Sequence, residues 1–167
     1  MVRWALAFAV VAAAASCAAD ELSPPGQPLT GFATVQATVT EIVDGDTIHV
    51  DLDGRDTAVR LIGIDTPEKE GPYTHLECYG EEATRHTAEL LDGRSVGLEF
   101  DVERTDRYER TLAYVWIGDE LVNETILRDG YAQLLTIPPD VAYVDRFRAA
   151  ERDAREAGRG LWGACPL

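Results

Sequence analysis

The stretch from Arg60 to Glu68 constrains the fold and the chemistry of this chain more than any other. Its apolar run, Leu61–Ile64, predicts a buried strand, and Pro67 ends that strand. Arg60 must meet an anion, because an unpaired buried charge is costly. The turn after the strand carries Asp65 and Glu68, so carboxylates and a guanidinium could together bind a metal, hold a phosphate and activate a water. Taken alone, the stretch would favour a strand followed by a solvated acidic turn.

Alternating apolar residues predict a chain of strands and helices around that stretch. The expected strands cover 34–43, 47–53, 57–64, 95–101 and 111–117, and the expected helices cover 81–91, 122–128 and 140–157. Asp44-Gly45 and Asp53-Gly54 are hairpin turn signals between the first three strands. This order is compatible with an α+β fold built on a five-stranded OB-fold barrel. One helix would lie between strands 3 and 4, and two helices would follow at the C-terminus.

Two aspartates are expected to meet at one rim of this barrel. Asp46 begins the second strand and Asp65 ends the third, and those two ends are neighbours in a hairpin. Two carboxylates with a backbone carbonyl and water form an oxygen site that suits calcium or magnesium rather than zinc. The alternative is that each aspartate only caps a turn.

Two arginines are candidates for binding a phosphate. Arg60 lies in the third strand and Arg110 opens the fifth. A guanidinium matches two phosphate oxygens at once, which an ammonium group cannot do. Salt bridges to nearby acidic residues are the alternative role for both.

Three motifs together resemble the staphylococcal nuclease (thermonuclease-like) family. They are Asp44-Gly45-Asp46-Thr47, the stretch from Arg60 to Glu68, and Arg104-Thr105-Asp106-Arg107-Tyr108-Glu109-Arg110, in the order and at the spacing of the family. The resemblance runs from about Val35 to Trp162 and also implies the OB-fold barrel.

The resemblance assigns roles to individual residues. It implies that Asp46, Asp65 and the carbonyl of Thr66 bind one Ca²⁺ ion. It implies that Arg60 and Arg110 hold the scissile phosphate and stabilise its charge during the reaction, and that Glu68 orients or deprotonates the attacking water. The resemblance also implies that Arg107 and Tyr108 bind the substrate.

The chain departs from the family pattern at two places. Glu109 stands where the staphylococcal enzyme has glycine, which adds a negative charge beside Arg110. Thr136 and Pro138 stand roughly where that enzyme presents tyrosines to the nucleotide base. The catalytic residues therefore match, whereas stacking on the base is in question.

The N-terminal segment predicts export. Residues 1–16 read as a signal peptide, residues 17–32 as a proline-containing tether, and residues 33–165 as the thermonuclease-like domain. Cys17 follows small residues, as at a bacterial lipoprotein cleavage site, so we favour lipidation of Cys17 and attachment to the cell envelope. Ala14 stands where such sites usually have leucine, and plain secretion is the alternative.

The remaining two cysteines, Cys78 and Cys165, are a candidate disulfide, because cysteines of exported proteins tend to pair. The alternative is two free thiols.

The net charge of −15 has the wrong sign for binding a polyanion through bulk electrostatics. It counts against a non-specific nucleic-acid coat protein but allows an enzyme whose positive charge is local. The sequence thus predicts a monomeric, exported, calcium-dependent nuclease that cuts DNA and RNA with little sequence preference and leaves 3′-phosphates. A non-catalytic nucleic-acid-binding OB module and a calcium-binding surface lipoprotein are the alternatives.

Overall fold

The computed structural model describes residues 34–72 and 75–166. The signal peptide expected over 1–16, the tether expected over 17–32 and the lipidation site expected at Cys17 lie outside the described residues. In the part of the chain that is described, no helix has the length and apolar character needed to cross a membrane.

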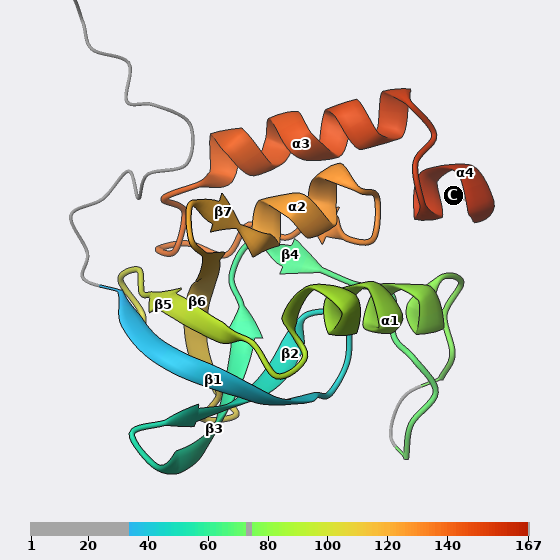
Figure 1. Cartoon of the computed structure of the whole chain (residues 1–167). Helices are drawn as coiled ribbons and strands as arrows, with labels where there is room; N and C mark the ends of the chain where they lie inside the picture. Colours follow the sequence, from blue (N-terminus) through green and yellow to red (C-terminus); the bar gives the residue numbers. More distant parts are fainter. Residues whose placement is uncertain (1–33, 73–74, 167) are drawn as a thin grey trace, which may run out of the picture.

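Five strands close into a barrel (Figure 1). They are β1 (Val35–Ile42), β2 (Thr47–Leu52), β3 (Arg55–Leu61), β5 (Ser95–Glu99) and β6 (Thr111–Ile117). Antiparallel pairs run in the order β3-β2-β1-β5-β6, and a parallel pairing of β3 with β6 closes the ring. The predicted OB-fold barrel is therefore confirmed, and the helix between its third and fourth strands is α1 (Gly80–Leu91).

The alternation in the sequence accounts for the wall of the barrel. In β1, Ala37 and Val39 are buried and the threonine that follows each of them is exposed. The β2–β3 hairpin turns through Asp53 and Gly54, whose φ angles are 54° and 77°. That left-handed backbone is what a two-residue hairpin turn needs, because it matches the twist of the flanking strands.

The prediction that Leu61–Ile64 forms one continuous strand is wrong. β3 ends at Leu61, and the two-residue strand β4 (Ile64–Asp65) pairs outside the barrel with β8 (Gln133–Leu134). Gly63 makes the break: its φ is 82°, and a Cβ atom there would lie 2.5 Å from the ring of Phe147. The chain bends at Gly63 because a helix side chain occupies the space beside it.

The two predicted C-terminal helices pack against each other beside the barrel (Figure 1). They are α2 (Val122–Arg128), which follows the short strand β7 (Glu120–Leu121), and α3 (Val144–Glu156). Asn123 in α2 is fully buried; its Oδ1 accepts the N–H of Val115 at 2.9 Å and its Nδ2 donates to the carbonyl of Ile62 at 2.8 Å. This one side chain therefore ties α2 to β6 and to the bend that precedes β4.

Helix α3 begins later than the expected start at Asp140. Asp140 Oδ1 instead accepts the N–H of Glu103 at 2.8 Å, and Asp101 Oδ2 accepts the N–H of Ala142 at 3.0 Å. Contacts to the loop after β5 thus hold this segment outside the helix. A further helix, α4 (Leu161–Ala164), was not predicted.

The C-terminus is tied back to the start of α1. Cys78 and Cys165 form a disulfide, with their Cα atoms 5.9 Å apart. The bond connects the residue two before α1 with the residue after α4.

Candidate active site

Asp46 lies buried in the turn that starts β2. Asp44 builds this turn, because its Oδ1 accepts the N–H groups of Asp46 at 3.1 Å and of Thr47 at 2.7 Å. Asp46 is 6% exposed, and its Oδ2 accepts the N–H of Thr66 at 2.9 Å and the Thr66 hydroxyl at 3.2 Å. Asp44 therefore caps the turn, whereas the carboxylate of Asp46 reaches across to the segment after β4.

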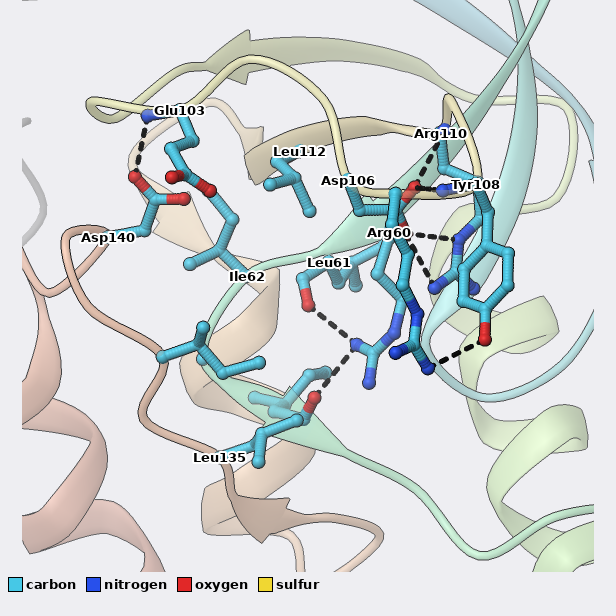
Figure 2. A pocket seen from close by; sticks show the side chains of 14 residues that line it. Arg60, Leu61, Ile62, Glu103, Asp106, Tyr108, Arg110, Leu112, Leu135 and Asp140 are labelled. Carbon is cyan, nitrogen blue, oxygen red and sulfur yellow. Dashed lines mark hydrogen bonds and ion pairs between the residues drawn. The ribbon is translucent and has the colours of Figure 1, made fainter.

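Arg60 joins Asp46 to Asp65. Its Nη2 lies 3.1 Å from Asp46 Oδ2 and 3.1 Å from Asp65 Oδ1. Its Nη1 donates to the carbonyls of Leu61 and Ile64, each at 2.8 Å (Figure 2). The bend after β3 supplies both carbonyls, so the fold fixes the plane of this guanidinium. The structure thus brings together three residues that the sequence singled out.

The carboxylates of this cluster have perturbed acidities. Burial, opposed by Arg60 and reinforced by Asp44, raises the pKa of Asp46 to about 6. Burial and three neighbouring carboxylates also raise the pKa of Glu68, with Arg60 opposing them. Burial is the main cause of both shifts, because it disfavours the charged carboxylate, and the neighbouring carboxylates add to it. A cation bound here would favour the charged form of both groups.

Arg110 is held by Asp106. Asp106 Oδ2 accepts from Nε and Nη2 of Arg110, each at 2.7 Å, and Oδ1 accepts the backbone N–H groups of Tyr108 and Arg110. Burial would raise the pKa of Asp106, but the hydrogen bonds from Arg110 and Tyr108 outweigh it and lower the pKa. Arg110 Nη1 lies 3.3 Å from the hydroxyl of Thr47, which places Arg110 next to the turn that carries Asp46.

Tyr108 lies close to two guanidinium groups. Its ring centroid is 4.7 Å from Cζ of Arg107 and 5.5 Å from Cζ of Arg110, and its hydroxyl accepts from Nη2 of Arg107 at 2.7 Å. Tyr108 is 64% exposed. Two arginines and a phenol on one exposed surface suit an anionic ligand with several oxygens.

A cleft of about 490 Å³ opens beside these arginines (Figure 2). Its lining comes from the end of β3, the bend into β4, the loop before β6, the start of β6 and the segment after β8. The lining residues are Arg60, Leu61, Ile62, Gly63, Ile64, Glu103, Asp106, Arg107, Tyr108, Arg110, Leu112, Leu135, Ile137 and Asp140. Among the described residues, Leu135 and Ile137 line the cleft and Thr136 and Pro138 do not. The wall near the expected base-binding positions is therefore aliphatic.

Arg60 is the link between the cleft and the carboxylate cluster. It lines the cleft and contacts Asp46 and Asp65, neither of which lines the cleft itself. Glu68 also lies outside the lining, within the described part of the chain, and its backbone N–H donates to Glu77 Oε2 at 3.1 Å. A phosphate that binds Arg60 from the cleft would therefore lie next to the carboxylate cluster, with Arg60 in contact with both.

The expected metal ligands fit a hard cation. Over residues 34–72 and 75–166, no three histidine, cysteine, aspartate or glutamate side chains gather into a metal cluster. The side-chain ligands would be the two carboxylates of Asp46 and Asp65, with the Thr66 carbonyl and water completing an all-oxygen set. Such a set beside excess negative charge suits Ca²⁺ or Mg²⁺ and does not suit zinc.

Sequence reasoning missed two kinds of residue. Asp106 lies inside the motif from Arg104 to Arg110, but no role was predicted for it; its spacing of four from Arg110 was the available signal. Leu135, Ile137 and Glu77 gave no signal, because only the folded chain brings them to the cleft or to Glu68.

Comparison with known proteins shows which family this chain belongs to. Residues 58–164 match the family model described as staphylococcal nuclease homologue. The chain is 41% identical over 124 residues to a thermonuclease of Staphylococcus hyicus, covering 74% of this chain and 73% of that protein. It is 42% identical over 124 residues to a thermonuclease of Staphylococcus intermedius, covering 74% of each. It is 37% identical over 130 residues to endonuclease YncB of Bacillus subtilis, covering 77% of this chain and 62% of that protein. The chain belongs to the staphylococcal nuclease family.

Proposed function

We propose that this protein is an exported, calcium-dependent endonuclease that hydrolyses phosphodiester bonds of DNA and RNA. The observation that carries the proposal is the position of Arg60, which lines the cleft and contacts both Asp46 and Asp65. The Nη1 hydrogens of Arg60 are taken by two carbonyls, so a phosphate would bind at its Nε or replace the exposed Asp65 at its Nη2, beside the cation site. The named relatives are a thermonuclease and an endonuclease.

In this proposal the chain contributes mainly positioning and electrostatic stabilisation. Arg60 and Arg110 donate to the non-bridging oxygens of the scissile phosphate, whose charge they stabilise as phosphorus becomes five-coordinate. Asp106 keeps Arg110 in place. Glu68, with its raised pKa, orients the attacking water or takes its proton. Departure of the 5′ oxygen would leave a 3′-phosphate.

Asp46, Asp65 and the carbonyl of Thr66 would hold the calcium ion. When bound there, the ion would supply positive charge at the phosphate. Asp46 is fixed for this role by its contacts to Thr66 and Arg60. Arg107 and Tyr108 would bind a further phosphate of the substrate.

Export and lipid attachment at Cys17 complete the proposal, and the protein would act as a monomer. The disulfide between Cys78 and Cys165 supports export, because such bonds persist in oxidising compartments. A Cys17→Ala variant would release the protein from the membrane fraction if lipidation anchors it, and would leave the fractionation unchanged if it does not.

The deciding experiment is cleavage of supercoiled plasmid and of a labelled RNA, with calcium and then with excess chelator. We expect calcium-dependent nicking and 3′-phosphate ends on the products. A non-catalytic OB module would bind without cutting.

Thermal unfolding separates the enzyme from a surface protein with a structural calcium site. Calcium should raise the melting temperature of the wild type by mass action, and raise it less for Asp46→Ala and Asp65→Ala. A calcium response without cleavage would support the structural site. An equal response in the wild type and in the Asp46→Ala/Asp65→Ala double variant would place the metal elsewhere.

A further inference from the structure

The backbone of Glu68 is held on both sides by one neighbouring residue. Glu77 Oε2 accepts the N–H of Glu68 at 3.1 Å, and the N–H of Glu77 donates to the carbonyl of Glu68 at 2.9 Å. These two bonds fix both backbone groups from which the Glu68 side chain extends. The direction of that side chain therefore depends on where Glu77 lies.

The start of α1 packs directly on the same backbone. A Cβ atom on Gly80 would lie 2.1 Å from the carbonyl oxygen of Glu68 and 2.9 Å from the nitrogen of Lys69, so no larger residue fits there. The same helix also reaches the metal-side turn, because the hydroxyl of Thr87 donates to the carbonyl of Gly45 at 2.7 Å. Helix α1 thus supports both the Glu68 segment and the turn that carries Asp46.

Little apolar burial holds the segment that contains Glu77. Glu77 and Cys78 are exposed, and Leu76 is 55% exposed. Tyr79 has a φ of 76°, a left-handed conformation that bulky residues rarely adopt unless their surroundings impose it. Segments with few buried apolar contacts open locally at low cost in free energy, so this one needs another restraint.

The disulfide supplies that restraint. It links Cys78, the residue next to Glu77, to Cys165 at the end of α4. The other end of α4 is fixed, because the N–H of Leu161 donates to the carbonyl of Gly130 at 2.8 Å. A continuous series of contacts thus runs from the C-terminal helices through the disulfide to Glu77. Figure 1 shows α4 and the C-terminus on the side of the molecule where α1 lies.

We propose that Glu77 is a positioning residue for Glu68, and that the Cys78–Cys165 disulfide keeps Glu77 in place. This rests on the proposed function, in which Glu68 orients or deprotonates the attacking water. Glu77 touches neither the substrate nor the metal ligands in this scheme; it acts through the backbone of Glu68. Full turnover then requires the oxidised form of the protein.

The first test compares three variants of the full chain. Glu77→Ala removes the acceptor for the Glu68 N–H, Glu77→Gln keeps an acceptor oxygen without the charge, and Glu70→Ala removes the same charge elsewhere in the loop. On plasmid DNA with saturating calcium, we expect Glu77→Ala to lower kcat about 10-fold with KM little changed. A loss of this size is typical when a residue that orients a site residue, without touching the substrate, is removed. Glu77→Gln should recover most of kcat, and Glu70→Ala should match the wild type.

A second measurement does not depend on activity. Hydrogen exchange of the Glu68 amide should be faster in Glu77→Ala than in the wild type and slow again in Glu77→Gln. Wild-type kcat together with wild-type exchange in Glu77→Ala would overturn the role of Glu77. If the wild type itself cuts no nucleic acid, the proposed function fails, and the exchange rates still decide whether Glu77 holds Glu68.

The disulfide is tested by reduction. Dithiothreitol donates two electrons and two protons to the bond, which gives two thiols and the cyclic disulfide of the reagent. Well below the melting temperature, reduction should lower kcat and speed exchange of the Glu68 amide. The Cys78→Ser/Cys165→Ser variant should show the same changes without reductant and no further change with it. A lower melting temperature with unchanged kcat and unchanged Glu68 exchange would show that the bond only stabilises the fold.

Discussion

Arg60 and Arg110 differ in how far the fold depends on them. The side chain of Arg60 is 13% exposed, neutralises the buried Asp46 and binds two backbone carbonyls. The side chain of Arg110 is 30% exposed and binds the partly buried Asp106. Removing one partner of a buried ion pair is far more destabilising than removing a surface charge, because the other charge stays buried without a partner.

We therefore expect the two alanine variants to separate stability from catalysis. Arg110→Ala should lower kcat by roughly 10²-fold or more, the effect of removing one oriented donor to a developing charge, with a small change in melting temperature. Arg60→Ala should lower both kcat and the melting temperature. Turnover and thermal unfolding measure the two effects, with Arg85→Ala, which removes an exposed arginine from α1, as the control. Near-wild-type turnover in either variant would refute its assignment to the phosphate.

Glu109 combines backbone strain with an unfavourable charge. Its φ is 64°, which costs a residue with a Cβ atom about 1 kcal/mol relative to glycine. Glu109 also places a carboxylate directly before Arg110 in the sequence. Glu109→Gly should raise the melting temperature by a few degrees, as about 1 kcal/mol does in a domain of this size, and lower KM for DNA. Glu109→Gln keeps the strain and removes the charge, so it should lower KM without raising the melting temperature. A lower melting temperature in Glu109→Gly would show that the left-handed conformation is not strained.

At the scale of elements, the spacing of apolar residues predicted the barrel strands and the main helices. A strand buries every second side chain and a helix buries every third or fourth, so both patterns can be recognised in the sequence. The prediction failed where a distant residue decides the backbone. The Leu61–Ile64 run breaks at Gly63 because Phe147, from a helix far along the chain, fills the adjacent space. The same limit applies to the site: Asp46 and Asp65 could be paired from strand order, whereas the support of Glu68 by Glu77 depends on how a loop folds back.

The contact between α1 and the segment after α2 should make stability depend on pH. His86 of α1 stacks on Tyr131, with ring centroids 3.9 Å apart, and its Nε2 lies 3.2 Å from Asp129 Oδ2. Burial lowers the pKa of His86 below its usual 6.5, although Asp129 and Glu89 oppose the shift. The unfolded chain therefore binds a proton first as the pH falls. The stability that neutral His86 contributes is complete above pH 6.5 and declines as the pH drops through that value toward the lower folded-state pKa.

His86→Phe keeps an aromatic ring for stacking and removes the titration. Urea unfolding of the wild type and of His86→Phe at pH 7.5 and 5.5 should show a larger loss of unfolding free energy in the wild type. Carboxylates that titrate in both proteins contribute equally to the two losses, so the difference between the losses reports on His86. Equal losses in the two proteins would contradict the assignment.

At the scale of the whole molecule, the protein must approach a polyanion against its own mean field. The chain carries a net charge of −15, while Arg60, Arg107 and Arg110 gather at one cleft. Two opposing effects of salt follow. Added salt screens repulsion from remote carboxylates, and it also weakens the attraction between the cleft arginines and phosphate, although less where the contacts are close and partly desolvated.

The balance between these effects predicts a maximum in activity against salt. The Debye length falls from roughly 30 Å at 0.01 M to about 3 Å at 1 M, so remote repulsion is strongest at the lowest salt and disappears first. With calcium held saturating, kcat/KM on long DNA should rise with monovalent salt and then fall. A basic nuclease would show only the fall, because counterion release dominates its binding. A steady decline of kcat/KM from the lowest salt upward would show that the local field of the cleft arginines, rather than the net charge, governs association of this protein with DNA.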